Sequence, residues 1–373
     1  VDPQTVLAEL DRAVNDLGWE LYPDGLHGFL TRFAAYGWPM VVTENGLADR
    51  SGRLRTPYLV QHVTAIERAI RDGADVRTLV YYNSFGRWGW LDALPQDVQD
   101  SIEVLPGDVR DSRRVDEAVA GRDTVFHLAA LIGIPYSYHA AESYVQTNVT
   151  GTFHVAEACR SHGARMVHTS TSEVYGTAIR VPIDEEHPLQ PQSPYSASKI
   201  GADMMALSYW HAHEVPVAVV RPFNTYGPRQ STRAVIPTIL AQLQAGATEI
   251  HLGAVSPRRD FNYVTDTAAG FVALADCDEA LGRATNVGSG REISIGELVE
   301  LCCEITGQPA TIVTDEARLR PEGSEVDRLL CDYSVAERIA GWRPQVSLED
   351  GLAATAEWVA AHLADLETSA YQI

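Results

Sequence analysis

Two short clusters of reactive side chains stand out in the middle of the chain. Tyr195 and Lys199 are four residues apart, a spacing that places both on one face of a helix. An ammonium beside the phenol lowers the tyrosine pKa from about 10, so that a phenolate can take a proton from a hydroxyl while a hydride leaves for a nicotinamide. This spacing is also common on ordinary helix surfaces. The upstream Thr171, Ser172 and Glu173, which follow an apolar run, favour the catalytic interpretation.

From about residue 76 to about residue 361, the chain resembles an extended short-chain dehydrogenase/reductase that acts on nucleotide sugars. It is most similar to the NAD-dependent 4,6-dehydratases, and within them to the legionaminic-acid-pathway branch, which acts on a nucleotide-linked N-acetylglucosamine. Beside the two clusters, four runs carry the resemblance: Tyr-Tyr-Asn-Ser-Phe at 81–85, Trp-Gly-Trp-Leu-Asp at 88–92, Ile-Pro-Tyr-Ser-Tyr-His at 134–139, and Arg-Pro-Phe-Asn-Thr-Tyr-Gly-Pro-Arg-Gln at 221–230.

The resemblance implies loss of water across C5–C6 of a nucleotide-linked hexose, leaving a 4-keto-6-deoxy sugar. Hydride would pass from C4 to NAD while Tyr195 takes the C4 hydroxyl proton; Glu173 would then remove the acidified C5 proton, and the hydride would return to C6. Thr171 would hydrogen-bond the C4 oxygen, and Ser172 would help to protonate the leaving hydroxyl, directly or through Glu173. Many dTDP-glucose dehydratases carry Asp at the Ser172 position, which leaves the identity of the acid open. Glu173 could instead be a salt-bridged structural carboxylate.

The resemblance also assigns residues to the cofactor and to the substrate. For the apolar residues among them, plain sheet packing is the alternative. The residues assigned to NAD are Asp108, Val109, Leu128, Ala129, Ala130, Asn148, Tyr195 and Lys199. Arginine suits bidentate phosphate binding, although any single arginine could be a solvated surface residue. The residues assigned to the nucleotide sugar are Arg221, Asn224, Arg229, Arg259 and Arg320.

The elements that must position these residues alternate between strands and helices. Apolar runs at 102–105, 124–128, 165–168 and 217–220 are separated by helical segments, which predicts an α/β fold with a doubly wound parallel, Rossmann-like sheet. The last third mixes short strands with helices and predicts a smaller substrate lobe. We therefore expect a Rossmann-like core over 76–222 and a lobe over 223–373, with some segments of the lobe returning to the core.

The first 75 residues do not follow the dehydratase pattern. Trp-Glu-Leu-Tyr-Pro at 19–23 and Pro-Met-Val-Val-Thr-Glu-Asn-Gly at 39–46 resemble the late part of a family-1 glycoside hydrolase barrel, in which the Glu of Thr-Glu-Asn-Gly is the nucleophile. A retaining glycosidase needs a second carboxylate, and the Asn-Glu-Pro motif that carries it in that family is absent from this sequence. Glu44 is thus interpreted as a relic. We predict a chimera in which a barrel unit supplies the first strand and helix of the sheet.

The exchange affects the expected cofactor site. A dinucleotide fold needs glycines where the backbone approaches the pyrophosphate, and no GxxGxxG occurs in residues 1–83. The corresponding turn offers Gly46 and the carboxylate of Glu44, so NAD binding is expected to be weakened. Three hypotheses stay open: a 4,6-dehydratase, a non-catalytic hybrid, and a nucleotide-sugar decarboxylase or epimerase.

The composition of the chain limits the classes of partner that we expect. The net charge of -21 disfavours nucleic acid and anionic membranes. Five scattered cysteines without metal-ligand spacing suggest reduced thiols, no metal site and a cytoplasmic location. His127, His139 and His168 are expected in packing or polar networks rather than as ligands. By resemblance, we expect a homodimer formed by the helices that follow Tyr144 and Pro194, with the apolar residues Met204, Met205, Leu207 and Tyr209 as candidates for the contact.

Overall fold

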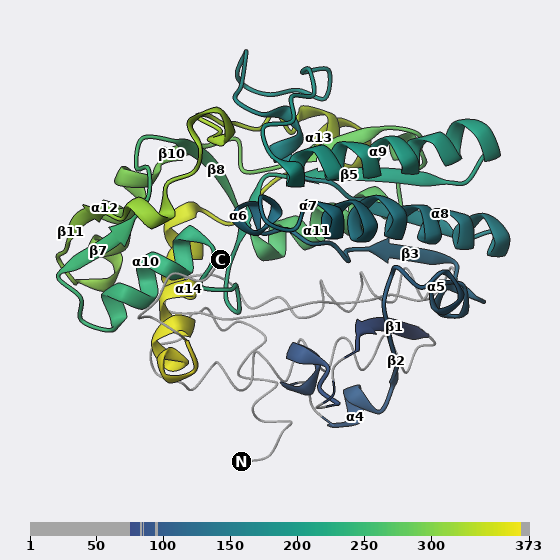
Figure 1. Ribbon diagram of the computed structural model, residues 1–373, viewed down its shortest axis with the longest axis horizontal. Helices are drawn as coiled ribbons and strands as arrows, with labels where there is room; N and C mark the ends of the chain where they lie inside the picture. Colours follow the sequence, from purple (N-terminus) through teal and green to yellow (C-terminus); the bar gives the residue numbers. More distant parts are fainter. Residues whose placement is uncertain (1–74, 83, 85, 94–95, 367–373) are drawn as a thin grey trace, which may run out of the picture. The chain divides into compact units, whose positions relative to one another are not determined.

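The computed structural model describes residues 75–82, 84, 86–93 and 96–366 (Figure 1). The expectations for the first strand and helix, and for the turn at Glu44, lie outside these residues. The chain divides into two compact units, of which the first comprises Val1–Phe126 and Glu157–Arg165, and the second His127–Ala156 and Met166–Ile373.

The described part of the first unit is built on two parallel strands. β1 (Val76–Tyr81) pairs with β2 (Ile102–Gly107), with Val76 opposite Ile102. Parallel neighbours need a crossover, which here contains η1 (Gly89–Ala93) and α4 (Gln96–Gln99). α5 (Ser112–Val119) begins at Asp111, whose carboxylate accepts from the N–H groups of the first helical turn, and it packs against both strands. The unit thus has the strand–crossover–strand organisation expected of an α/β fold.

The second unit contains a buried parallel sheet. β4 (Arg165–Thr169), β5 (Val217–Pro222) and β9 (Ala284–Val287) run parallel, with β5 in the middle. Val217 to Arg221 are all buried, as expected where helices cover both faces of a parallel sheet. α9 (Pro194–His213) and α11 (Val264–Ala275) both pack against β5. The predicted α/β class with parallel strands is confirmed.

α9 is the helix that carries the Tyr–Lys pair. Ser193 caps it in a reciprocal arrangement: its hydroxyl accepts from the Ser196 N–H at 3.1 Å, and the Ser196 hydroxyl accepts from the Ser193 N–H at 3.0 Å. Pro194 occupies the first turn, where a missing N–H costs nothing. The helix ends at Glu214, whose φ of 56° is left-handed. Local sequence signals therefore fix where α9 begins.

A second helical run faces α9. It consists of α6 (Ile134–Ser137), α7 (Ala141–Tyr144), a π-helical turn η2 (Val145–Thr150) and α8 (Gly151–His162). η2 contacts α9. Single π-helical turns inside α-helices are frequent at functional sites, and this one carries the buried Asn148.

The C-terminal part adds small sheets and helices around a separate apolar core. In Figure 1 they lie around the labels α10, α12 and α14. The strands pair in the orders β10–β8–β6 and β11–β7. The elements are β6 (Asn224–Tyr226), α10 (Val235–Gln244), β7 (Glu249–Leu252), β8 (Arg258–Tyr263), β10 (Glu292–Ser294), α12 (Ile295–Thr306), β11 (Thr311–Thr314) and α14 (Leu348–Ala361).

Short elements complete the described chain. They are β3 (Thr124–His127), η3 (Ser172–Tyr175), η4 (Asp278–Ala280), η5 (Glu316–Arg318), η6 (Glu322–Ser324), α13 (Ser334–Ala340) and η7 (Leu363–Asp365). In the described residues, no helix has the length and apolar character that a membrane span requires.

Candidate active site

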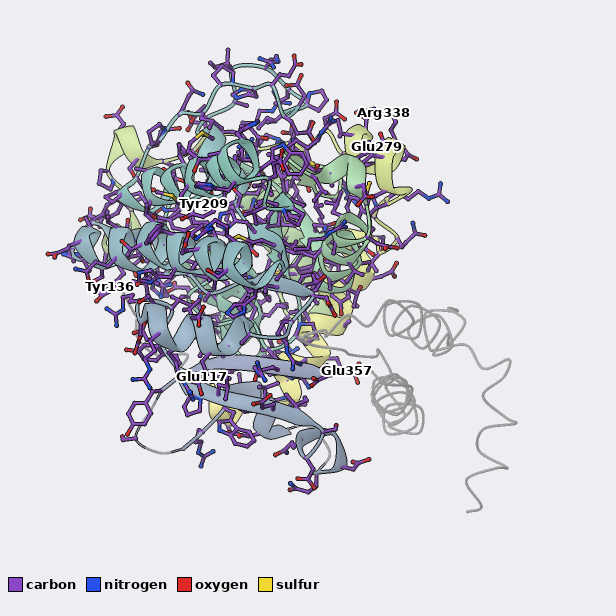
Figure 2. The ribbon with its side chains drawn as sticks, turned by 90° about the vertical axis from the view of Figure 1, so that its right-hand side faces the viewer. Glu117, Tyr136, Tyr209, Glu279, Arg338 and Glu357 are labelled. Carbon is purple, nitrogen blue, oxygen red and sulfur yellow. The ribbon has the colours of Figure 1, made fainter. Side chains whose placement is uncertain are left out.

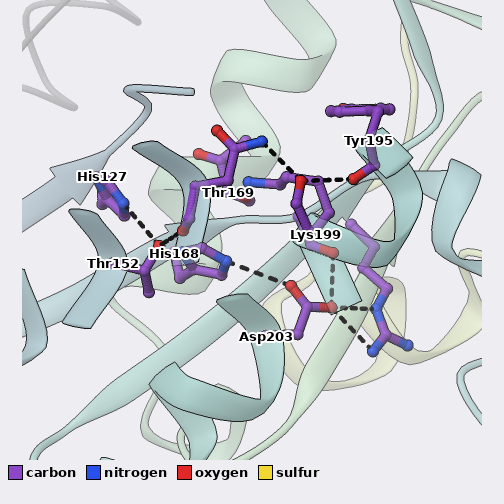
Figure 3. Close-up of polar contacts among 11 residues, drawn as sticks. His127, Thr152, His168, Thr169, Tyr195, Lys199 and Asp203 are labelled. Carbon is purple, nitrogen blue, oxygen red and sulfur yellow. Dashed lines mark hydrogen bonds and ion pairs between the residues drawn. The ribbon is translucent and has the colours of Figure 1, made fainter. Parts of the chain in front are cut away.

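Tyr195 and Lys199 lie on the buried side of α9, next to the end of β4 (Figure 3). The Lys199 Nζ donates to the backbone carbonyl of Thr169 at 2.5 Å. The Tyr195 ring meets the Tyr144 ring edge-on, with 6.2 Å between centroids. The helical spacing predicted from the sequence therefore brings both groups to one strand end, and neither is a surface residue.

Burial shifts the pKa of both groups. It lowers the pKa of Lys199 to about 8, against an upward pull from the charge of Asp203. It raises the pKa of Tyr195 well above its usual range, although a hydrogen bond with the Thr171 side chain acts in the opposite direction. The expectation of a lowered tyrosine pKa is therefore wrong for this structure. The desolvation of the phenol outweighs its hydrogen bond, and the ammonium is bonded to Thr169.

The Thr-Ser-Glu run forms η3, directly after β4. The Thr171 hydroxyl accepts from the Glu173 N–H at 3.2 Å and so caps this short helix. Thr171 and Ser172 are buried, whereas Glu173 is half-buried. The charge of Glu173 acts on Tyr195 and on Arg259. The structure thus gathers Thr171, Glu173 and Tyr195 at one site.

A buried carboxylate, Asp203, lies one helical turn beyond Lys199. It accepts from the Ser170 hydroxyl at 2.7 Å and from two guanidinium nitrogens of Arg221 at 3.2 and 3.1 Å, and it lies 3.3 Å from His168 Nε2. Burial acts to raise the pKa of Asp203, but His168 and Arg221 outweigh it and lower that pKa. Arg221 also donates to the Tyr175 hydroxyl at 3.0 Å. Its guanidinium is thus hydrogen-bonded to Asp203 and Tyr175 inside the fold, and we do not propose Arg221 as a phosphate ligand.

Asn148 links three parts of the site from the π-helical turn. Its side-chain oxygen accepts from the Leu131 N–H at 2.8 Å, and its amide nitrogen donates to the Leu131 carbonyl and to the Ser198 hydroxyl, both at 2.9 Å. Its backbone carbonyl accepts from Thr152, which also contacts His127 at 3.0 Å. Asn148 therefore holds the segment after β3 against α9. His127 and His168 belong to this polar interior, as expected.

The other residues assigned to NAD are divided between the two units. In the second, Leu128 is 42% exposed and Ala129 is exposed, while Ala130 is half-buried. In the first, Asp108 and Val109 follow β2 and are half-buried. Asp108 makes a close ion pair with Arg110, 2.5 Å between Oδ2 and Nη2, and this pairing lowers the pKa of Asp108.

Two of the assigned arginines share one carboxylate. Arg259 on β8 donates to Glu325 Oε1 at 3.0 Å, and Arg320 approaches the same oxygen at 3.4 Å. Burial lowers the pKa of Arg259, opposed by the charges of Glu173 and Glu325. Asn224 lies beside this strand and donates to the Asp260 carbonyl at 3.3 Å. Arg229 is half-buried and has a left-handed φ of 68°. Glu173, Arg259 and Arg320 thus belong to one charged cluster.

Sequence reasoning missed two acidic residues that organise this site. Asp203 had a usable signal, because it follows Lys199 by four residues and shares its helix face. Glu325 had none, since its link to Arg259 spans 66 residues of sequence.

Comparison with known proteins identifies the family. Residues 63–355 match the family described as GDP-mannose 4,6 dehydratase. The chain belongs to this family. It is 34% identical to a dTDP-glucose 4,6-dehydratase of Actinoplanes sp., over 84% of this chain and 92% of that one, and 32% identical to a UDP-glucose 4-epimerase of Mycolicibacterium smegmatis, over 79% and 94%. The NAD- and TYD-bound structure of DesIV, a dTDP-glucose 4,6-dehydratase from Streptomyces venezuelae, is 28% identical, with a TM-score of 0.72 over 83% of this chain and 95% of that one.

A second match covers the start of the chain. Residues 4–96 match glycosyl hydrolase family 1, and this range overlaps the dehydratase match at 63–96. The two family signals seen in the sequence are therefore both found by comparison.

Proposed function

We propose that the chain is a nucleotide-sugar 4,6-dehydratase whose catalytic residues are Thr171, Ser172, Glu173, Tyr195 and Lys199. The observation that carries this proposal is the placement of a carboxylate, Glu173, at the Tyr195 site, together with the hydrogen bond between Thr171 and Tyr195. Oxidation at C4 alone needs only the phenol. Elimination across C5–C6 needs a further base, and Glu173 is available for that task.

The described residues fit NAD on the side of the reacting sugar. Leu128 and Ala129 expose apolar surface after β3, and the segment that follows is held to α9 by Asn148. NAD, when bound, accepts a hydride and returns it. The chain's own residues move the protons: Tyr195 takes the C4 hydroxyl proton, and Glu173 takes the C5 proton. Ser172 or Glu173 supplies the proton with which the C6 hydroxyl leaves as water. The second proton taken up, held by Tyr195 or Glu173, returns to C5 when C6 is reduced.

For the substrate, we propose a diphosphate-linked hexose held by Arg259 and Arg320. Both guanidinium groups converge on Glu325, and the charge of Glu173 reaches Arg259. A diphosphate at these arginines places the attached sugar toward the catalytic carboxylate. The runs at 81–85 and 134–139 favour a nucleotide-linked N-acetylglucosamine.

The discriminating test is product mass. Purified protein, NAD and a panel of nucleotide hexoses should give a product lighter than the substrate by one water. A product of unchanged mass would indicate an epimerase, the activity named for the Mycolicibacterium relative. Loss of carbon dioxide from a uronic acid would indicate a decarboxylase.

We also propose that the chain is a chimera whose first 75 residues derive from a family-1 glycosidase barrel. The match over residues 4–96 supports this origin. Because the sequence lacks the Asn-Glu-Pro motif, we expect no hydrolysis of aryl glucosides. Measurable hydrolysis that Glu44→Gln abolishes would contradict the interpretation of Glu44 as a relic.

For assembly, we propose a homodimer formed through η2, α8 and α9. Met204 on α9 is 45% exposed, and Val145 and Phe153 on the facing run are exposed too. Tyr209, labelled in Figure 2, is by contrast buried, and its ring meets the Phe153 ring edge-on within the same chain, with 6.4 Å between centroids. Light scattering should give twice the chain mass, and Met204→Asp should shift the protein to a monomer.

A further inference from the structure

Lys199 is the only lysine in the chain. The 373 residues contain 29 basic Lys and Arg side chains, and all the others are arginine. Arginine stays protonated in proteins, whereas a lysine amine can lose its proton when it is buried. A titratable side-chain amine therefore occurs at a single position, one helical turn from Tyr195.

The surroundings of Lys199 disfavour its charge. The side chain is 3% exposed, and among the described residues its hydrogen bond is the 2.5 Å bond to the neutral Thr169 carbonyl. Removing an ammonium from water favours its neutral form unless an opposite charge lies near. The compensating charge therefore has to come from the groups that face it.

Those groups come from several elements. β3 and β4 contribute His127 and His168, on which the charge of Lys199 acts and whose pKa values burial lowers, which favours their neutral forms. In the same interior, the cation Arg221 of β5 bonds to Asp203 and to Tyr175 of η3. The half-buried Glu173 of η3 acts on Tyr195. α9 itself contributes Tyr195 and Asp203. Of the charges near Lys199, the one that raises its pKa is Asp203.

Asp203 is built to hold a negative charge in this interior. It is 0% exposed, and its Oδ2 accepts from Ser170 and from the Arg221 fork (Figure 3). Oδ1 has no hydrogen bond of good geometry, and its contact is with His168. A residue four positions after Lys199 on a helix lies about 5–6 Å away between Cβ atoms. Both side chains therefore lie on one face of α9, and the charge of the carboxylate acts on the ammonium.

We propose that Asp203 is a positioning residue of the dehydratase site that keeps the chain's single lysine cationic, one helical turn from Tyr195. The effect of Asp203 on the reaction rests on the proposed function. Its effect on the charge of Lys199 does not, because that charge can be measured without substrate. Arg221, Ser170 and His168 then keep Asp203 ionised. Through Asp203, these three residues help to keep the Lys199 amine protonated.

The single lysine makes the test direct. Protein grown with isotope-labelled lysine should show one side-chain signal by NMR, and its pH titration should have a midpoint near 8. In Asp203→Asn, the midpoint should fall by at least about one pH unit, as expected for loss of a nearby unit charge in a partly polar interior. The matched control Asp203→Glu keeps the charge and should stay near the wild-type midpoint. An unchanged midpoint in Asp203→Asn would overturn the proposal.

Asp203→Asn leaves the buried charge of Arg221 without the carboxylate that it pairs with, and this variant could fail to fold. A second comparison covers that case. Arg221→Met and the double variant Asp203→Asn/Arg221→Met differ only at Asp203, and the double variant should titrate at least about one pH unit lower. Equal midpoints in this pair would overturn the proposal as well.

Activity separates this proposal from the proposed function. If the protein oxidises its substrate at C4, the high-pH limb of that step should move to lower pH in Asp203→Asn, and Asp203→Glu should restore it. If no nucleotide hexose reacts but the lysine midpoint still moves as expected, the dehydratase proposal fails and the charge-holding role of Asp203 stands.

Discussion

The end of β4 and the end of β2 carry residues assigned to one reaction, but they present them differently. After β4, Thr171 and Ser172 are buried, and so are Tyr195 and Lys199 on the neighbouring α9. After β2, Asp108 is half-buried and pairs with the exposed Arg110. Buried groups have positions and pKa values that the fold determines. An ion pair near the surface contributes about 0–1 kcal/mol and can rearrange at little cost. The groups after β4 are therefore preorganised, whereas the ion pair after β2 is adaptable.

The largest effect is expected from Tyr195→Phe. The substitution removes the group that takes the C4 hydroxyl proton while keeping the ring that packs against Tyr144. C4 oxidation should slow by about 10²–10⁴-fold, the usual contribution of a positioned acid or base. The rate of formation of reduced nicotinamide in a single turnover measures it. A loss of less than tenfold would show that another group takes this proton.

Glu173→Gln should divide the reaction in two. The amide keeps the size of the carboxylate but cannot accept the C5 proton, so C4 oxidation should proceed while water loss stops. Exchange of the C5 proton with deuterated solvent should stop too. If both half-reactions fall equally, Glu173 is a structural carboxylate at this site and not the base.

Glu44→Gly probes the predicted phosphate turn, which lies outside the described residues. Removing a carboxylate from the predicted phosphate turn should tighten NAD binding by about tenfold or more, equivalent to about 1.4 kcal/mol. Titration calorimetry measures both proteins. A micromolar or tighter constant in the unchanged protein, with no gain in the variant, would show that the turn is already competent.

The smallest effect is expected from Ser193→Ala at the start of α9. The substitution removes one side of the capping pair with Ser196 and should cost about 1 kcal/mol of stability. Denaturant unfolding checks this value, with Ser208→Ala, on the exposed side of the same helix, as the control. If C4 oxidation falls far more than stability does, the cap also positions Tyr195.

Much of the fold and part of the candidate site could be predicted from the sequence. The strand runs at 102–105 and 217–220, and the helix start at Ser193, follow from local periodicity and capping. Tyr195, Lys199 and Glu173 were found because motif spacing maps onto one helix face and one strand end. The rest depends on tertiary contacts. The burial that raises the pKa of Tyr195, the engagement of Arg221 with Asp203, and the sharing of Glu325 by two arginines join segments that no local pattern connects.

The central claim is a C4 oxidation whose hydride ends at C6. The most direct measurement uses a nucleotide hexose carrying deuterium at C4, incubated with the protein and NAD and analysed by mass spectrometry and NMR. We predict a product that has lost one water and carries deuterium in the new C6 methyl group. Deuterium that stays at C4 in a sugar of unchanged mass, or substrate that is recovered unreacted while NAD is bound, would contradict it.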